Sequence, residues 1–211
     1  FSVIGEGEEA MLQIIEAYEK DLEYSDIQGV AYISDGEIHK PCGAGIVKDV
    51  DALPLPARHL LPMEKYRTSA VRTRNFPAYS IITSRGCPLK CTFCYNKMEY
   101  RRKVRYLDPG KRIDEIQHLI KDYGAREIHF WDDNFILNKR IVDEFCDTME
   151  DRKIKIPFDI EVIIHAANRD FVVPALERLK KLGLYSVSFG IESGTQRMLD
   201  FMDKKTTLEE I

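Results

Sequence analysis

From residue 77 onward, short apolar runs alternate with longer segments whose apolar residues recur at helical spacing. The runs predict strands at residues 79–84, 127–131, 158–164 and 185–191. The segments between them predict amphipathic helices that begin after Asp108, Asn138 and Asp170, which are residue types that cap helices well. Strand–helix units in series are typical of a parallel sheet with right-handed crossovers. The pattern therefore indicates an α/β fold.

The N-terminal residues predict a helix and a hairpin. Residues 1–4 have the apolar character of a strand end, and a glycine-rich turn leads from them into an amphipathic helix. One face of this helix carries Met11, Ile14, Ile15 and Tyr18. Farther on, Asp35-Gly36 is a hairpin turn signal between an apolar run at residues 29–34 and a returning run at residues 37–40.

A proline-rich stretch separates these elements from the repeated part of the chain. Residues 41–77 contain prolines at positions 41, 54, 56, 62 and 77, and they show no sustained periodicity. Proline fixes the backbone and lacks an N–H donor, so this stretch predicts an extended connector between two domains. We therefore expect three parts: the end of an α/β domain at residues 1–25, a hairpin and linker at 26–76, and the strand–helix part at 77–211.

The two ends of the chain predict a fragment of a longer protein. Thr206-x-x-Glu209 is a capping box, and the chain stops in the first turn of the helix that it predicts. The first residue is Phe1 rather than methionine. Four parallel strands would also leave an edge that no predicted element covers.

The composition is that of a globular protein and restricts the partners. The chain has 211 residues, of which 44% are apolar and 31% charged, and its net charge of −4 favours neither nucleic acid nor an acidic membrane as a partner. No apolar run approaches the roughly 20 residues of a membrane helix, and no signal peptide is visible. The five cysteines, three of them close together, do not suit a secreted disulfide scaffold. We therefore expect a metal site and a reducing compartment, the cytoplasm.

Three cysteines lie on one short segment directly after the first predicted strand. Residues 85–96 read Arg-Gly-Cys-Pro-Leu-Lys-Cys-Thr-Phe-Cys-Tyr-Asn, so Cys87, Cys91 and Cys94 have the spacing C-x3-C-x2-C. Thiolates bind iron–sulfur clusters, which usually take four of them. Three thiolates would leave one iron with an open position, and an open position is where a metal does substrate chemistry.

Two other metal sites fit these cysteines less well. A structural zinc knuckle usually combines paired C-x2-C units or added histidines, and this segment has one pair and no adjacent histidine. An electron-transfer ferredoxin needs a fourth cysteine, and only Cys42 or Cys146 can supply it, if the fold brings one of them close. A cluster with one open iron is therefore the leading interpretation.

The segment resembles the defining motif of the radical S-adenosylmethionine (radical SAM) superfamily, C-x3-C-x-aromatic-C, with Phe93 as the aromatic residue. The resemblance implies a [4Fe–4S] cluster held by Cys87, Cys91 and Cys94, with S-adenosylmethionine (SAM) on the open iron. One electron from the cluster would cleave SAM to methionine and a 5′-deoxyadenosyl radical, which abstracts hydrogen from the substrate. The resemblance also implies a (β/α)6 TIM-like barrel, of which the chain would hold four of the six strand–helix units.

Two further segments resemble the superfamily at the ends of predicted strands, where parallel barrels have their working face. Asp132, Asp133 and Asn134 follow the second strand, in the place of a polar stretch near the methionyl amine of SAM. Glu192 and Ser193, within Gly-Ile-Glu-Ser-Gly, follow the fourth strand, in the place of a stretch near the ribose and methionyl groups. The alternatives are an ordinary loop before the next helix and an ordinary strand–helix turn.

Residues 3–8 and the linker at 49–58 resemble the cobalamin (B12)-binding group of the superfamily, in which a doubly wound α/β domain precedes the barrel. This group includes methyltransferases that act on unreactive carbon or phosphorus and anaerobic ring-forming cyclases. The chain departs from the group in two places. The D-x-H-x-x-G cobalamin signature is absent, and Ile163-Ile164-His165 stands where relatives often have an arginine facing the SAM carboxylate. His165 either replaces that arginine or is an ordinary surface histidine.

The leading hypothesis is a radical SAM enzyme that performs cobalamin-dependent methyl transfer or radical cyclisation on an unidentified substrate. One alternative is a methylthiotransferase-like radical SAM enzyme acting on RNA, but only Cys42 precedes the motif to serve its additional cluster. The other alternative is a non-catalytic iron–sulfur electron carrier. The resemblance implies a small-molecule substrate and an electron donor of the flavodoxin or ferredoxin type, and neither nucleic acid nor a membrane is expected as a partner. The missing signature leaves the presence of cobalamin open.

Overall fold

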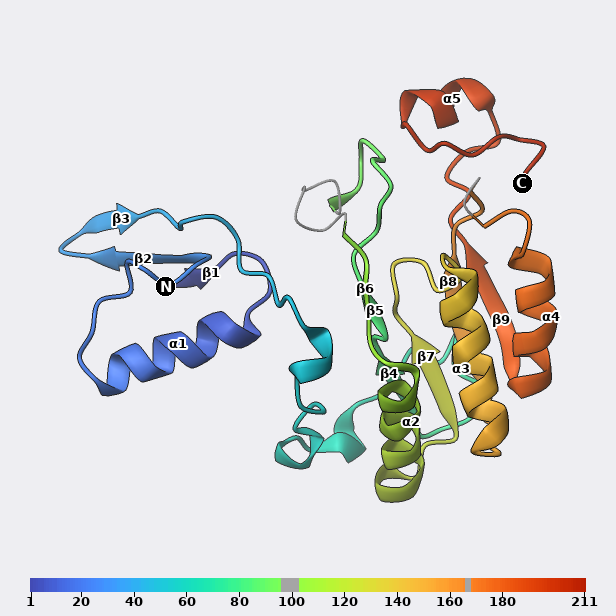
Figure 1. The fold of residues 1–211 in the computed structure, drawn as a ribbon, viewed down its shortest axis with the longest axis horizontal. Coiled ribbons are helices and arrows are strands. Elements are labelled where there is room, and N and C mark those ends of the chain that lie inside the picture. The colour runs from blue at the N-terminus through green and yellow to red at the C-terminus, as the bar shows by residue number, and fades with distance from the viewer. Residues whose placement is uncertain (96–102, 166–167) are drawn as a thin grey trace. The chain divides into compact units, whose positions relative to one another are not determined.

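The computed structural model describes residues 1–95, 103–165 and 168–211 and forms two compact units (Figure 1). The first unit comprises Phe1–Val50 and the second Asp51–Ile211. The hairpin that we expected in the linker thus groups with the N-terminal helix. The proline-rich residues from Asp51 onward group with the parallel sheet.

The first unit contains an antiparallel sheet. Its strands are, in spatial order, β1 (Ser2–Val3), β2 (Val30–Ser34) and β3 (Glu37–His39). The hairpin predicted at Asp35-Gly36 is confirmed, because β2 and β3 pair on either side of these two residues. Both turn residues have positive φ, 51° at Asp35 and 80° at Gly36, as the two-residue turn that matches strand twist requires.

Helix α1 (Glu8–Glu19) packs in this unit through a different face from the predicted one. The buried cluster consists of Ala10, Ile14 and Ala17 from the helix with Ile27 and Val30. Three residues expected on the buried face are exposed instead: Met11 by 40%, Ile15 by 50% and Tyr18 by 77%. The prediction weighed only large apolar side chains, whereas the alanines four residues before and three residues after Ile14 complete the helical spacing of the buried stripe.

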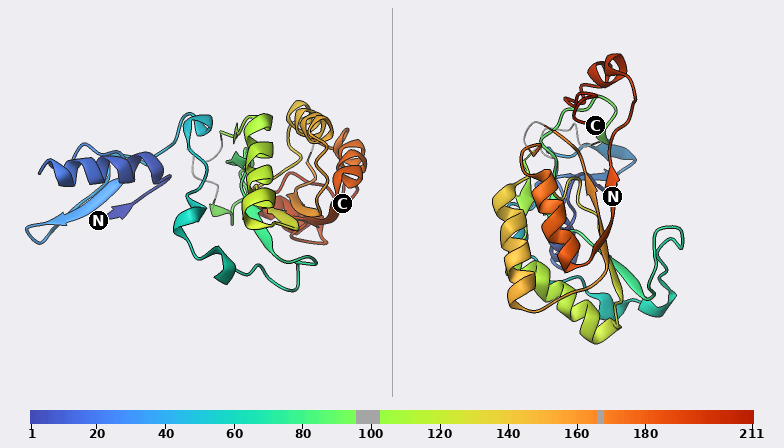
Figure 2. Two further views of the ribbon diagram at one scale, coloured as in Figure 1. Left: turned by 90° about the horizontal axis from the view of Figure 1, so that it is seen from below. Right: turned by 90° about the vertical axis from the view of Figure 1, so that its right-hand side faces the viewer.

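The second unit is built on a four-stranded parallel sheet with three helices on one face (Figures 1 and 2). Its strands are, in spatial order, β4 (Ala78–Ile81), β7 (Glu127–Phe130), β8 (Phe158–Val162) and β9 (Leu184–Phe189). The helices are α2 (Pro109–Tyr123), α3 (Lys139–Asp151) and α4 (Val172–Leu182). The predicted α/β fold with its strand–helix units is therefore confirmed. Within the described residues the sheet is open and does not close into a barrel.

Two of the three predicted helix starts are confirmed. The Asp108 carboxylate accepts a hydrogen bond of 2.8 Å from the Gly110 N–H, and Gly124 ends α2 in the left-handed conformation. The Asn138 side chain accepts a bond of 3.4 Å from the Ile141 N–H at the start of α3. These side chains satisfy N–H groups that have no partner within the helix.

Asp170 does not cap α4, so this prediction is wrong. The first turn of the helix has no side-chain cap, and the Val172 N–H donates instead to the Asn168 carbonyl. Asn168 is fully buried, and its amide donates to the carbonyls of Ile136 at 2.6 Å and Ile163 at 2.8 Å. The buried asparagine therefore shapes the entry to α4 through distant backbone groups.

The core between the sheet and the helices is rich in aromatic rings. Phe130, Phe145 and Phe158 are at most 1% exposed. The Phe130 ring meets the other two edge to face, with centroids 5.7 Å from Phe145 and 5.4 Å from Phe158. Such pairs add about 0.5–1.5 kcal/mol each beyond the burial of their surface. This core fixes β7 and β8 against α3 and so positions the strand ends that carry the polar motifs.

Several short elements were not predicted. They are β5 (Ser84–Arg85), β6 (Arg105–Tyr106), α5 (Gln196–Phe201) and the 3₁₀ turns η1 (Val50–Ala52), η2 (Arg58–Leu60) and η3 (Met63–Lys65). Strand β5 pairs with β6 in antiparallel fashion, so the strand predicted at residues 79–84 breaks after Ile81. Among the described residues, every helix is too short or too polar to cross a membrane.

The capping box predicted at Thr206 and Glu209 is wrong. The Thr206 hydroxyl donates to the Ile164 carbonyl at 2.7 Å, and it is the Glu210 carboxylate that accepts the Thr207 N–H at 2.9 Å. Only a single turn follows. The motif is thus shifted by one residue, and its threonine anchors the C-terminal segment to the loop after β8.

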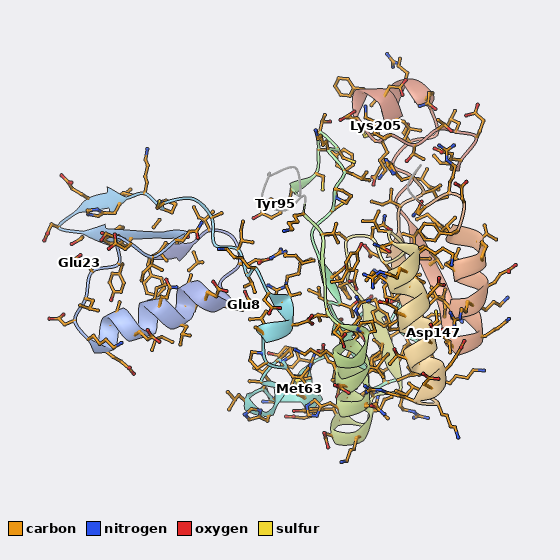
Figure 3. The ribbon with its side chains drawn as sticks, in the orientation of Figure 1. Glu8, Glu23, Met63, Tyr95, Asp147 and Lys205 are labelled. Carbon is orange, nitrogen blue, oxygen red and sulfur yellow. The ribbon has the colours of Figure 1, made fainter. Side chains whose placement is uncertain are left out.

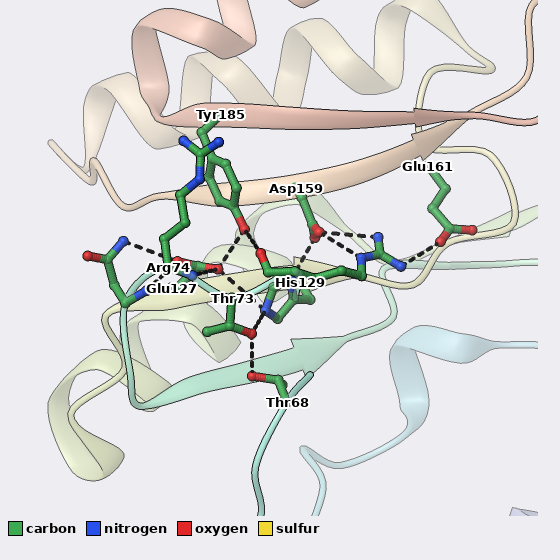
Figure 4. A network of polar contacts seen from close by, with 10 residues as sticks. Thr68, Thr73, Arg74, Glu127, His129, Asp159, Glu161 and Tyr185 are labelled. Carbon is green, nitrogen blue, oxygen red and sulfur yellow. Dashed lines mark hydrogen bonds and ion pairs between the residues drawn. The ribbon is translucent and has the colours of Figure 1, made fainter. Parts of the chain in front are cut away.

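The sheet face opposite the helices, here called the inner face, is polar and holds the linker (Figure 4). The side chains that meet there form what we call the inner-face network: Thr68, Arg72, Thr73, Arg74, Asn75, Glu127, His129, Asp159, Glu161 and Tyr185. Half of them belong to residues 68–75 of the linker and the other half to strands of the sheet. The linker predicted as an extended connector is therefore bound to the sheet by side chains.

Two buried residues of β7 make most of these bonds. The Glu127 carboxylate, 0% exposed, accepts the N–H groups of Arg74 and Asn75 and lies 2.6 Å from the Tyr185 hydroxyl. The His129 ring lies between the carboxylate of Asp159, at 2.8 Å, and the hydroxyl of Thr73, at 3.1 Å. Buried polar groups of this kind stabilise a structure only when all are partnered, so the linker and the strands depend on each other.

Candidate functional site

The three cysteines of the predicted metal motif lie together beside the end of a parallel strand. They belong to what we call the cysteine loop, residues 86–95, which follows β5 and whose last residue, Tyr95, is labelled in Figure 3. Cys87 and Cys91 are 6% and 5% exposed and form a buried cluster with Leu89. Half-buried Cys94 packs against this cluster together with Ile163, the residue that follows β8. The fold therefore packs the three cysteine residues into one cluster.

The surroundings of the buried thiols of the cysteine loop favour their neutral form. Burial raises the pKa of the Cys87 and Cys91 thiols, and the nearby Cys94 thiol raises both further. Thiolates here therefore need a positive partner, and a coordinated metal provides it because it deprotonates its thiol ligands outright. The donor set, three thiols on one buried loop, fits an iron–sulfur cluster.

The three thiols do not converge on a single point. Within residues 1–95, 103–165 and 168–211, no group of three or more His, Cys, Asp or Glu side chains is placed to hold one metal ion. In a cubane each cysteine binds a different iron atom, so its ligands do not have to meet at one centre. The assignment of Cys87, Cys91 and Cys94 as cluster ligands stays a prediction.

Asp132, predicted to contact SAM, is fully engaged within the protein. It is 2% exposed and accepts hydrogen bonds from the Thr83 N–H at 3.1 Å and from the Ser84 hydroxyl at 2.5 Å. Burial raises the pKa of Asp132, while the bonds from Ser84 and Thr83 and the charge of Arg112 oppose this shift. Asp132 therefore holds the chain between β4 and the cysteine loop in place.

The next two residues of the same motif, Asp133 and Asn134, use fewer of their polar atoms in bonds within the protein than Asp132 does. Asp133 is exposed. Burial is the main cause of the raised pKa of Cys87, and the negative charge of Asp133 raises that pKa further. The Asp133 carboxylate therefore lies near the Cys87 thiol. Asn134 is 3% exposed, and its side-chain oxygen accepts the Ile163 N–H at 3.3 Å. The Asn134 amide nitrogen is buried and has no hydrogen-bond partner among the described residues. An unpaired buried donor is costly, which makes this amide a candidate for a ligand contact.

Glu192 and Ser193 follow β9 and differ in what they contact. Glu192 has a positive φ of 70° and accepts a bond of 3.1 Å from the Lys204 ammonium. The Ser193 hydroxyl accepts the Thr195 N–H at 3.2 Å, in the turn before α5. The predicted contacts of Glu192 and Ser193 with SAM stay predictions, and the structure adds Lys204 as a neighbour of the motif.

The sequence did not predict a role for Lys204, because this residue precedes Lys205 and has the character of a surface lysine. Its side chain is only 2% exposed, and its ammonium lies 5.9 Å from the centre of the Phe93 ring, close enough for a cation–π contact. Next to it, the Thr92 N–H donates to the Met202 carbonyl at 2.9 Å. The segment around α5 therefore docks on the cysteine loop, and Lys204 links that loop to Glu192.

His165 is half-buried and lies in the turn that leads to α4. Its backbone N–H donates to the Asn168 side chain at 2.9 Å. Burial lowers the pKa of the His165 imidazole, while Glu210 raises it and Arg169 lowers it. A ring biased towards its neutral form is a weaker partner for a carboxylate than the arginine of relatives. Both interpretations of His165 nonetheless remain open.

Comparisons with known proteins identify the family of the chain. The model of the radical SAM superfamily matches residues 81–211. An uncharacterised methyltransferase, PH0819, of Pyrococcus horikoshii is 30% identical over 99% of this chain and 43% of its own length. The anaerobic magnesium-protoporphyrin IX monomethyl ester cyclase of Cereibacter sphaeroides is 30% identical over 99% of this chain and 34% of its own length. The chain thus spans less than half the length of these curated relatives.

One solved structure shares the fold of nearly the whole chain. The cobalamin-dependent SAM radical enzyme OxsB, with aqua-cobalamin and SAM bound, has a TM-score of 0.78 and 25% sequence identity. The match covers 98% of this chain and 30% of OxsB. The cysteine spacing, the parallel sheet and these matches lead to one conclusion: the chain belongs to the radical SAM superfamily.

Proposed function

We propose that the protein is an enzyme that cleaves SAM at a [4Fe–4S] cluster held by Cys87, Cys91 and Cys94. The observation that carries this proposal is the gathering of the three thiols against Ile163, at the strand end where parallel barrels have their active sites. When bound, the cluster supplies the electron that cleaves SAM, and the 5′-deoxyadenosyl radical abstracts hydrogen from the substrate. The residues of this chain bind, orient and shield the reactants.

Within the motif after β7, we assign different roles to the three polar residues. Asp132 is a positioning residue, because both of its oxygens accept bonds from Thr83 and Ser84. Asp133 and Asn134 are the residues that we expect to contact the methionyl group of SAM. A carboxylate near Cys87 and an unpartnered buried amide support this assignment. A carboxylate attracts the ammonium group of methionine, and the amide N–H donates to an acceptor.

Glu192 and Ser193 are proposed to complete the SAM site from the neighbouring strand end. The Glu192 carboxylate accepts one bond from Lys204, and a carboxylate has further lone pairs for the hydroxyls of a ribose. Ser193 supplies a hydroxyl that rotates to donate or accept. Phe93, which is 54% exposed, is proposed to cover the side of the site next to Lys204.

The reaction that we propose is methyl transfer or radical cyclisation with cobalamin as a further cofactor. The names of the relatives support this, because PH0819 is called a methyltransferase and the Cereibacter sphaeroides protein a cyclase. OxsB, a cobalamin-dependent enzyme, matches 98% of the chain, which includes most of both units. We accordingly propose that residues 1–25 end a cobalamin-binding domain. A small-molecule substrate, an electron donor of the flavodoxin or ferredoxin type, and a cytoplasmic location complete the proposal.

The test is anaerobic reconstitution of the protein with iron and sulfide, followed by addition of dithionite and SAM. We expect 5′-deoxyadenosine to form. Cys91→Ala is expected to lose the cluster and to abolish this product, because two thiols cannot hold a cubane that normally requires at least three protein ligands. Cys42→Ala is the matched control, since Cys42 is exposed and lies in the first unit.

Two outcomes would contradict the proposal. An intact cluster that yields no 5′-deoxyadenosine would favour an electron carrier. Undiminished cleavage by Cys91→Ala would refute the ligand assignment. Cobalt content of the purified protein decides separately whether cobalamin is bound.

A further inference from the structure

A cavity of about 510 Å³ lies between the linker and the inner face of the sheet. The linker side is formed by residues near η2 and η3, where Met63 is labelled in Figure 3. The sheet side is formed by Ala78 and Ser80 of β4, His129 of β7 and Trp131. This volume lies within the range of about 300–1,000 Å³ that is usual for small-molecule pockets.

The lining combines rings with positive charge. Trp131 and Tyr66 contribute aromatic surface, and they are 57% and 56% exposed. Three arginines also line the cavity, and the lining contains no Asp or Glu side chain. A cavity with aromatic walls and only positive charges attracts ring-bearing anions more than neutral or cationic molecules.

Only one of the three arginines is available for a ligand. Arg58 pairs with Glu115 at 2.5 Å, and Arg72 pairs with Asp159 and Glu161 at 3.1 and 3.2 Å. Arg67 is exposed, and no carboxylate of a described residue pairs with it. The exposed guanidinium of Arg67 is therefore the positive group of the cavity lining that a ligand can reach.

The cavity reaches the edge of the sheet that carries the proposed SAM site. The Trp131 N–H donates to the Ile81 carbonyl at 2.9 Å, at the carboxyl end of β4, and Trp131 directly precedes Asp132. At its other end the cavity is bounded by the inner-face network, through His129 and Thr68. A molecule in the cavity therefore extends from the network towards the cysteine loop.

From this placement we infer that the cavity binds a ring-bearing molecule with one anionic group, with its ring on Trp131 and its anion on Arg67. The inference rests on the proposed function in one respect: such a molecule in this place would be the substrate of the radical reaction. Trp131 offers a π-face that Arg72, 5.8 Å from the ring centre, helps to hold in place. The guanidinium of Arg67 binds a carboxylate, sulfonate or phosphate through paired N–H donors.

The test uses two probes that differ by one charge. 8-Anilino-1-naphthalenesulfonate is a ring-bearing anion, and N-phenyl-1-naphthylamine has the same rings without the sulfonate. Trp131 is the only tryptophan of the chain, so energy transfer from its fluorescence to a bound probe reports binding near this residue. We expect the anionic probe to bind about tenfold more tightly than the neutral one, since a hydrogen bond to a charged group is worth about that factor.

Variants of exposed lining residues locate the binding. Arg67→Ala is expected to remove the preference for the anionic probe, and Arg67→Lys to keep part of it. Arg126→Ala, which changes an exposed arginine outside the cavity lining, is the matched control and should leave both affinities unchanged. Ser80→Phe, which fills the cavity from the inner face, is expected to weaken both probes.

Equal affinity for the two probes, or the same preference in Arg67→Ala, would overturn the inference. So would undiminished binding in Ser80→Phe or an absence of energy transfer from Trp131, the result if another part of the protein already fills the cavity. These measurements need no cluster and no SAM. Probe binding without SAM cleavage would therefore contradict only the proposed function. SAM cleavage without probe binding would contradict only the inference about the cavity.

Discussion

The cysteine loop and the inner-face network both bury polar groups, but the partners in the two places lie at very different separations in the sequence. The thiols of the cysteine loop come from a stretch of eight residues, Cys87 to Cys94. In the network, Thr73 and His129 are 56 residues apart, and Glu127 and Tyr185 are 58 apart. The first place is visible as a motif because local spacing defines it. The second exists only once the chain has folded.

The inner-face network and the cysteine loop also differ in whether their buried polar groups have hydrogen-bond partners. No buried side-chain nitrogen or oxygen of the inner-face network lacks a hydrogen-bond partner among the described residues. Near the cysteine loop, the Asn134 amide nitrogen is buried and has no partner among the described residues. Protein groups thus satisfy the network, whereas a buried donor beside the loop is left unsatisfied.

Among variants that distinguish the inner-face network from the cysteine loop, we expect the largest effect from Glu127→Ala. The change removes the buried carboxylate that accepts the N–H groups of Arg74 and Asn75, and it leaves the Tyr185 hydroxyl with the Arg72 carbonyl as its remaining acceptor. We expect the free energy of unfolding to fall by about 3 kcal/mol or more, with cleavage of SAM per folded molecule unchanged. Urea titration measures the first quantity and 5′-deoxyadenosine formation the second.

Glu161→Ala is the matched control for this prediction. Glu161 belongs to the same network, but its side chain is 44% exposed and forms one ion pair, so its loss should cost about 1 kcal/mol or less. Equal losses for the two variants would show that burial does not set the importance of a network member.

A smaller effect is expected from Lys204→Met, at the contact between the cysteine loop and the α5 segment. The change removes the ammonium that joins Phe93 to Glu192 but keeps an apolar side chain of similar length. The loop should open more often, and iron should pass from the reconstituted cluster to a chelator about tenfold faster. Lys205→Met is the control, because the Lys205 side chain is 65% exposed. An unchanged rate in Lys204→Met would show that the Lys204 ammonium does not hold the cysteine loop closed.

The smallest effect is expected from Tyr185→Phe at alkaline pH. Burial raises the pKa of Tyr185 above its usual value, and the bond to Glu127 raises it further. In the unfolded chain the phenol ionises near its ordinary pKa of about 10, so above that pH the unfolded state binds fewer protons than the folded state. The stability contributed by Tyr185 is thus full below about pH 10 and is lost as the pH rises.

The measurement is the slope of unfolding free energy against pH between about pH 9 and 11. The wild-type protein should lose stability more steeply in this interval than Tyr185→Phe. Parallel slopes would mean that the phenol does not keep its proton in the folded state.

Much of the second unit could be predicted because its signals are local. The four parallel strands and the caps at Asp108 and Asn138 follow from residues that are neighbours in the sequence. The grouping of the three cysteines also follows from their spacing. Identification of the superfamily needed only these residues.

The predictions that failed depend on residues far apart in the chain. Asp170 does not cap α4 because Asn168 arranges that turn through the distant carbonyl of Ile136. Lys204 has the character of a surface lysine until the fold places it against Phe93 and Glu192. The hydrogen bonds from Thr83 and Ser84 to Asp132 also join residues that are distant in the sequence, and the predicted contact of Asp132 with SAM stays a prediction. No local pattern carries this information.

The central claim is that three thiols hold a cubane and leave one of its irons for SAM. The most direct measurement is the electron paramagnetic resonance spectrum of the reduced, reconstituted cluster before and after addition of SAM. We expect one [4Fe–4S] signal from the wild-type protein, and we expect this signal to change when SAM binds. Each of the variants Cys87→Ala, Cys91→Ala and Cys94→Ala should lose the signal. A signal that SAM leaves unchanged, or one that survives the loss of a motif cysteine while depending on Cys42 or Cys146, would contradict it.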